Sequence, residues 1–171
     1  MGVIDRLLTD NSSAARPVTA RPGDPRPSRQ LAVVTCMDTR IEALEALGLK
    51  TGEAHILRNA GGLITPDMLR SLAVSQLYLG TREILLMHHS DCGMEKIDEE
   101  DFHAKSVAAT GIAPPFSGGA FIDAETSVRE SIDRVRAALF LPHRDVVRGV
   151  ILDVATGHVR EVSQPPVNEA G

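Results

Sequence analysis

The sequence predicts an α/β fold: a largely parallel central sheet flanked by helices, with an N-terminal helical arm and a C-terminal hairpin. Two observations lead to this prediction. Apolar runs typical of strands alternate with segments of helical periodicity, as in proteins built from parallel strands. One of these runs, EILLMHH at 83–89, is continuously apolar, as expected of a strand whose two faces are both covered.

The first half of the chain divides into an arm and the start of a domain. A short helix is predicted over residues 2–10, with an apolar face formed by Val3, Ile4, Leu7 and Leu8. Residues 12–30 hold four prolines and almost nothing apolar, so they are expected to form an extended connector. The elements predicted next are strand 31–35, helix 41–48, strand 54–59, a helix from Pro66 to Gly80, and strand 83–89.

The second half closes the domain. Residues 95–122 are acidic at first and then rich in Gly and Pro, which indicates short helical pieces and a loop. The segment 123–140 is a strongly amphipathic helix whose apolar face contains Val128, Ile132, Val135 and Leu139. Residues 148–154 and 158–162 are expected to pair as a hairpin. The chain therefore divides into an arm (1–30), a domain (31–162) and a tail expected to be disordered (163–171).

Composition excludes several classes of function. The net charge of -5 and the lack of a basic stripe argue against nucleic-acid binding. The apolar runs are much shorter than the roughly 20 residues of a membrane span, and the N-terminus lacks the apolar segment of a secretion signal. We therefore expect a cytoplasmic protein, where a pair of cysteines more often binds metal or acts in catalysis than forms a disulfide.

The stretch TCMDTR (35–40) places three reactive side chains at the end of the first strand of the domain. Cys36, Asp38 and Arg40 occupy alternate positions, so an extended chain projects all three to the same side. A strand that only filled a core would carry apolar groups there. The pattern indicates a functional edge that uses a soft ligand, an acid and a cation.

The third strand of the domain ends in a second reactive stretch, MHHSDCGM (87–94). His89 and Cys92 are near enough in sequence to bind one ion from a single turn, and functional groups gather at the carboxyl ends of parallel strands. With Cys36 they form a suitable zinc site that leaves a fourth position open. Alternatives are that both cysteines are buried small hydrophobes, that they form a disulfide, or that His88 is the ligand.

Three motifs together resemble the signature of the β-class carbonic anhydrases. They are C-x-D-x-R, HILRNAGG and HHSDCGM, and the later segments ETSVRESIDRV and RGVILDVATG are also similar to that family. The resemblance covers about residues 31–162 and points to the compact bacterial and archaeal branch. It implies one zinc ion per chain, bound by Cys36, His89 and Cys92, and reversible hydration of CO₂ to bicarbonate and a proton by zinc-bound hydroxide.

The resemblance also assigns roles around the zinc. Asp38 and Arg40 become the catalytic pair: Asp38 orients the attacking group, and Arg40 holds the carboxylate away from the zinc, which Asp38 otherwise binds in a closed state. Without the cysteines, the same two residues would suggest a plain ion pair at a strand end. Residues expected beside the substrate pocket are Asn59, Ala60, Gly61 and Gly93.

Substrate and assembly are less closely specified. The glutamine and tyrosine that line the plant-type cavity have no evident counterpart, so Phe102, Phe116 and Phe121 are candidates to line the pocket instead. Relatives in the compact branch are carbonyl sulfide hydrolases, which makes carbonyl sulfide an alternative substrate; a non-catalytic, zinc-stabilised binding module is a further alternative. The family forms its active site between subunits, which implies a homodimer or a dimer of dimers.

Overall fold

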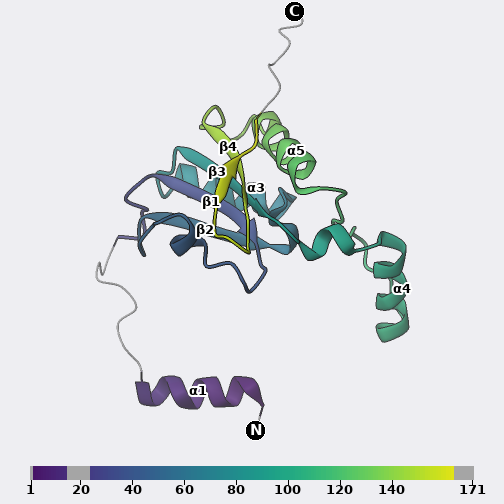
Figure 1. Cartoon of the computed structure of the whole chain (residues 1–171). Coiled ribbons are helices and arrows are strands. Elements are labelled where there is room, and N and C mark those ends of the chain that lie inside the picture. The colour runs from purple at the N-terminus through teal and green to yellow at the C-terminus, as the bar shows by residue number, and fades with distance from the viewer. Residues whose placement is uncertain (1, 15–23, 164–171) are drawn as a thin grey trace, which may run out of the picture.

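The computed structural model describes residues 2–14 and 24–163 of the chain. Its centre is a five-stranded sheet with the strand order β2-β1-β3-β4-β5 (Figure 1). The first four of these strands are parallel, and β5 is antiparallel to β4, which confirms the predicted sheet and its closing hairpin. The strands are β1 (Leu31–Cys36), β2 (Ala54–Asn59), β3 (Glu83–His89), β4 (Val147–Leu152) and β5 (Val159–Glu161).

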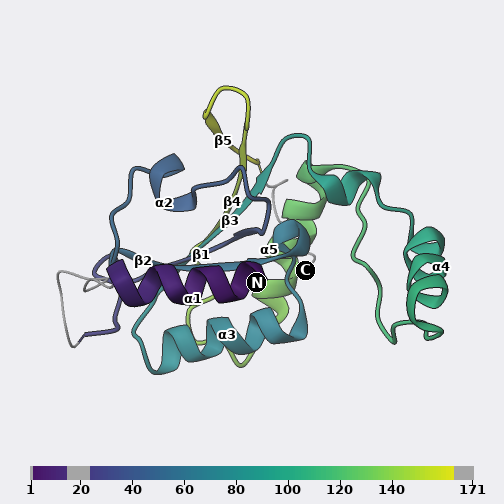
Figure 2. The same cartoon turned by 90° about the horizontal axis from the view of Figure 1, so that it is seen from below.

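Helices cover both faces of the sheet. Two long helices, α3 (Pro66–Leu77) and α5 (Ala124–Ala137), lie on one face, and the short α2 (Ala43–Ala46) lies on the other (Figure 2). Because side chains alternate along a strand, Val34 of β1 packs in the core under α3 and α5, whereas Val33 packs with the opposite cluster. Burial on both faces explains why the central strands are apolar throughout.

The end of α5 differs from the sequence-based prediction. Three residues of its predicted apolar face are buried: Val128, Ile132 and Val135. The assignment of Leu139 to this face is wrong, because the helix ends at Ala137 and Leu139 is 77% exposed. Beyond that point the helical period no longer applies, and Leu141 enters the core instead.

The segment after β3 contains a longer helix than predicted. A short 3-10 turn, η2 (Gly93–Lys96), is followed by α4 (Glu99–Thr110), which the Asp98 carboxylate caps by accepting a hydrogen bond from the N–H of Asp101. Every residue of α4 is at least partly exposed, and the helix stands away from the sheet (Figures 1 and 2). Without a buried face, α4 has no apolar periodicity for sequence reasoning to detect.

The arm begins with α1 (Val3–Ala14), which extends into the stretch predicted to be connector. All of its residues are exposed, including the four apolar ones, whose exposed fractions lie between 62% and 73%. About half of the predicted connector (15–23) and nearly all of the predicted tail (164–171) fall outside the described residues. Among the helices that the structure describes, none is both long and apolar enough to cross a membrane.

Candidate metal centre

Three predicted ligands converge where two neighbouring strands end. Cys36 is the last residue of β1, His89 is the last residue of β3, and Cys92 lies in the turn that follows. One ligand atom from each lies within 4.8 Å of the others, and all three residues are buried. The parallel pairing of β1 and β3 therefore assembles, from distant parts of the sequence, a group that could hold a metal ion.

The hydrogen bonding of His89 fits a metal ligand. Its Nδ1 lies 3.0 Å from the backbone oxygen of Ser90, and because a carbonyl can only accept, this nitrogen carries the proton. Its buried Nε2 has no hydrogen-bond partner within the described part of the chain. Burial also lowers the pKa of His89, which favours the neutral ring. An unshared electron pair thus faces the two cysteines, as expected of a ligand imidazole.

The thiols complete a donor set suited to zinc. Burial raises the pKa of Cys92 to about 11, so without a cation nearby this residue stays protonated. A metal ion would supply the positive charge that stabilises the thiolate. Two thiolates and one imidazole are ligands that zinc prefers, and the donor set leaves room for a fourth ligand.

Asp38 and Arg40 form a tight pair beside this cluster. The Nε and Nη2 atoms of Arg40 donate to the two carboxylate oxygens of Asp38 at 3.0 and 2.7 Å, and the backbone N–H of Arg40 donates to Oδ1 at 2.9 Å. These hydrogen bonds hold the pKa of Asp38 well below its usual range. The Oδ2 atom lies 4.0 Å from Nε2 of His89, so an anionic carboxylate stands next to the candidate metal position.

Asp91 also contacts Arg40, and sequence reasoning missed it. Its Oδ2 accepts a hydrogen bond from Nη1 of Arg40 at 3.0 Å, and its backbone oxygen accepts one from Nη2 at 3.0 Å. The other carboxylate oxygen accepts from Nζ of Lys96. The available signal was the position of Asp91 inside HHSDCGM, between two candidate ligands.

Arg58 is a second residue that sequence reasoning missed. From the end of β2, its guanidinium donates hydrogen bonds to the backbone oxygens of Cys36 (2.9 Å), Ile41 (3.0 Å) and Asp38 (2.6 Å). These three carbonyls belong to the loop that carries the predicted ligand and the Asp38–Arg40 pair. Arg58 therefore fastens this loop to the neighbouring strand.

The turn after β2 supports the same edge of the sheet. The side-chain amide of Asn59 donates to the backbone oxygen of Leu63 and accepts from its N–H, both at 2.8 Å. Gly62 has a φ of +68°, and a Cβ there would stand 2.9 Å from the backbone carbon of Thr35. Only glycine lets this turn approach β1 so closely.

A cavity of about 540 Å³ opens over the cluster. Three of the residues predicted beside the pocket line it, namely Ala60, Gly61 and Gly93, whereas Asn59 is engaged by Leu63. The apolar lining comes from Met37, Met94 and Ile97. The three candidate phenylalanines are not among the lining residues: Phe102 packs near Gly118, Phe116 is 65% exposed, and Phe121 packs between the two core clusters.

His88 lies outside the cluster, as the H-x-x-C spacing predicts. Its Nε2 is 3.0 Å from the hydroxyl of Ser127 on α5, and its ring lies 5.6 Å from that of Phe121. Burial lowers the pKa of His88 to about 4, so the ring is neutral. It is a packed neighbour of the ligand group rather than a member of it.

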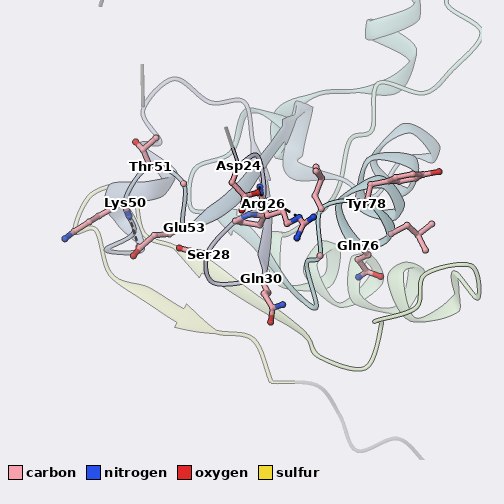
Figure 3. Close-up of a pocket in the computed structure, with 14 residues that line it drawn as sticks. Asp24, Arg26, Ser28, Gln30, Lys50, Thr51, Glu53, Gln76 and Tyr78 are labelled. Carbon is pink, nitrogen blue, oxygen red and sulfur yellow. Dashed lines mark hydrogen bonds and ion pairs between the residues drawn. The ribbon is translucent and has the colours of Figure 1, made fainter. Parts of the chain in front are cut away.

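A larger cavity, of about 930 Å³, lies elsewhere on the molecule (Figure 3). It is formed by the chain before β1, the chain before β2 and the end of α3. The amide of Gln76 is engaged there by the backbone of His143, and Glu53 by Lys50 and Arg29. This cavity lies at the amino ends of β1 and β2, whereas the candidate metal ligands lie at the carboxyl ends of the parallel strands.

The fold and this cluster define an α/β protein with a candidate Cys–His–Cys metal centre at the carboxyl edge of a parallel sheet. A family model described as "Carbonic anhydrase" matches residues 31–113. Over 137 residues the chain is 46% identical to "Beta-carbonic anhydrase 1" of Mycobacterium tuberculosis, covering 80% of this chain and 84% of the relative. The chain therefore belongs to the β-carbonic anhydrase family.

Other comparisons agree with this assignment. A crystal structure of carbonic anhydrase from Streptococcus mutans superimposes with a TM-score of 0.86 at 37% identity, covering 95% of this chain and 99% of the other. "Carbon disulfide hydrolase" of Acidithiobacillus thiooxidans is 31% identical over 154 residues, which cover 78% of this chain and 77% of the relative. This relative is named for carbon disulfide, whereas the sequence suggested carbonyl sulfide as the sulfur-containing substrate.

Proposed function

We propose that the chain catalyses the reversible hydration of CO₂ to bicarbonate and a proton, with one zinc ion per chain held by Cys36, His89 and Cys92. The observation that carries this proposal is the Asp38–Arg40 pair beside three convergent metal-ligating atoms. A site that only stabilised the fold would not need a carboxylate and its clamp at this place. This argument also disfavours the non-catalytic binding module.

Each residue around the cluster has a separate role in the proposed reaction. A zinc ion bound here would supply a Lewis acid that makes water nucleophilic near neutral pH. Asp38 stays anionic because of its lowered pKa, so it is a poor proton acceptor but a good hydrogen-bond acceptor for the attacking water. Arg40 keeps that carboxylate oriented, and Gly93 lines the cavity, where its N–H is proposed to meet an anionic product.

Hydrolysis of a sulfur analogue of CO₂ is the second candidate. It is favoured by the relatives named carbon disulfide hydrolase and by the cavity lining, in which Met37, Met94 and Ile97 offer soft, apolar contacts. A paired assay on one preparation decides: CO₂ hydration by stopped flow, and consumption of carbonyl sulfide and of carbon disulfide. Activity on the sulfur compounds without CO₂ hydration would make their hydrolysis the favoured function.

We also propose that the protein acts on small molecules as a homodimer or a dimer of dimers in the cytoplasm, without nucleic-acid or membrane partners. The apolar face of α1 is exposed in the single chain, which is unfavourable in water unless another surface covers it. The proposed compartment follows from the proposed metal site, because in a reducing cytoplasm a pair of cysteines more often binds metal than forms a disulfide. The assembly is tested by the experiment on α1 described below.

A further inference from the structure

Arg40 binds two acidic residues, and only one of them belongs to the C-x-D-x-R motif. Its Nε and Nη2 atoms contact Asp38, while Nη1 and Nη2 contact the carboxylate and the backbone oxygen of Asp91. Both sides of the guanidinium are therefore occupied. This arrangement fixes the plane of the guanidinium as well as its position, because an arginine presents its donors in a rigid fork.

Asp91 is itself held in an unusual conformation. Its φ is +54°, in the left-handed region that aspartate and asparagine tolerate better than most residues. This backbone conformation lies between the candidate ligands His89 and Cys92. The second carboxylate oxygen of Asp91 is bound by Lys96 of η2. The turn that positions two candidate ligands therefore also positions a hydrogen-bond acceptor for Arg40, which Lys96 holds in place.

We infer that Asp91 is a positioning residue: it anchors Arg40 so that the arginine can hold Asp38 away from the metal position. The inference rests on the proposed function and deepens it. The side chain of Arg40 is 46% exposed, so a single carboxylate partner would leave it considerable rotamer freedom. A second anchor removes that freedom and favours the orientation in which Arg40 grips Asp38.

The opposite view is that Asp91 makes an ordinary surface ion pair, of the kind that often contributes little. The test uses Asp91→Gly and Asp91→Asn, since glycine and asparagine both accept a positive φ and both variants should fold. The matched control is Asp67→Asn, which breaks an exposed ion pair with Arg70 in the first turn of α3 and alters no hydrogen bond of Arg40.

The first measurement is the solvent-exchange rate of the Arg40 Nε–H, followed by ¹⁵N NMR and assigned with Arg40→Lys. We expect this rate to rise about fivefold in Asp91→Gly, and less in Asp91→Asn, which keeps an acceptor oxygen. Asp67→Asn should leave the rate unchanged. Because the measurement does not depend on turnover or on bound metal, it decides the inference even if the wild-type protein neither binds zinc nor hydrates CO₂.

The second measurement is the pH profile of CO₂ hydration per bound zinc. A loosened Arg40 releases Asp38, so the midpoint of the Asp91→Gly profile should move to higher pH by about half a unit. A lower melting temperature with an unchanged exchange rate and an unchanged midpoint would overturn the inference. Absence of CO₂ hydration in the wild-type protein would instead count against the proposed function.

Discussion

Arg58 donates a 2.6 Å hydrogen bond to the backbone oxygen of Asp38, and so binds the backbone of the loop after β1 rather than the Asp38 carboxylate. With its bonds to the oxygens of Cys36 and Ile41, it satisfies three carbonyls with one guanidinium. Lysine offers a single nitrogen and cannot span these three acceptors. Arg58→Lys should therefore lower the free energy of unfolding by about 1–2 kcal/mol, measured by urea denaturation.

Arg58→Lys should also weaken zinc binding, measured by competition with a chelator, because the loop that carries Cys36 is no longer fastened. The control is Arg70→Lys, since Arg70 is exposed and pairs only with Asp67 in the described structure. Equal zinc affinity in the Arg58 variant and the wild type would show that β1 alone positions the ligand.

Arg40→Ala should reduce the rate per bound zinc by roughly 10²-fold, the usual effect of losing an orienting or general-base function. Activity should rise with pH in both proteins. If zinc is bound as proposed, Asp38 would compete with water for the open position, more successfully at low pH than at high pH, where hydroxide would bind more tightly. The midpoint would then belong to the coupled system of Asp38 and the metal-activated water.

This prediction is tested by measuring turnover between about pH 6.5 and about pH 9, normalised to zinc content. If the Asp38–Arg40 pair only braces the end of the strand, Arg40→Ala would lower the melting temperature but keep the wild-type rate and pH profile.

Metal analysis of the purified protein should find one zinc ion per chain. Cys92→Ala should lose it, because two remaining ligands do not hold zinc tightly. His88→Gln is the matched control: His88 is the adjacent histidine but bonds Ser127 on α5, so this variant should keep its zinc. Full zinc content in Cys92→Ala would remove Cys92 from the ligand set.

Gly62→Ala should destabilise the protein more than Gly157→Ala. Both glycines have a positive φ, which costs an alanine about 1–2 kcal/mol. At Gly157 a Cβ meets nothing within 4 Å, whereas at Gly62 it meets the backbone of Thr35 and Cys36, which should add about 1–3 kcal/mol. Urea denaturation of the two variants measures the difference; equal losses would mean that the turn can move away from β1.

Light scattering at micromolar concentration should show a dimer or a larger assembly. Deletion of residues 1–28, or the double substitution Leu7→Glu and Leu8→Glu, should weaken it, because charges on the apolar face of α1 oppose burial. Ser13→Glu is the control, since helical periodicity places Ser13 away from that face. A monomeric wild-type chain would contradict the proposed assembly.

The central strands could be predicted closely because their environment dictates their composition. β3 occupies the residues predicted for it, 83–89, and β1 extends one residue beyond the predicted 31–35, since strands covered on both faces must be apolar. The edge strand β2 also matches its prediction, 54–59. The end of α5 and the length of α4 could not be predicted, because Leu139 continues an apolar period after the helix has ended and α4 buries no face.

The candidate site, too, could be predicted from the sequence only in part. Cys36, His89 and Cys92 could be proposed from spacing within two short motifs, and the structure brings them together. The contacts of Arg58 and Asp91 join segments that are far apart along the chain, so no local pattern reveals their partners, even though Asp91 lies inside a candidate ligand motif. Their roles depend on the pairing of β1 with β2 and with β3, which only the fold specifies.

The placement of Cys36 and His89 on adjacent strands has a consequence for folding. The intervening chain forms α2, β2 and α3 before it enters β3, so an ion bound to both residues would close this whole segment into a loop, as a cross-link does. The unfolded chain has no preformed site, so binding energy adds to folding energy: about 4 kcal/mol when free metal is a thousandfold above the dissociation constant. Zinc supply during synthesis would then govern how much of this protein reaches and keeps its native state.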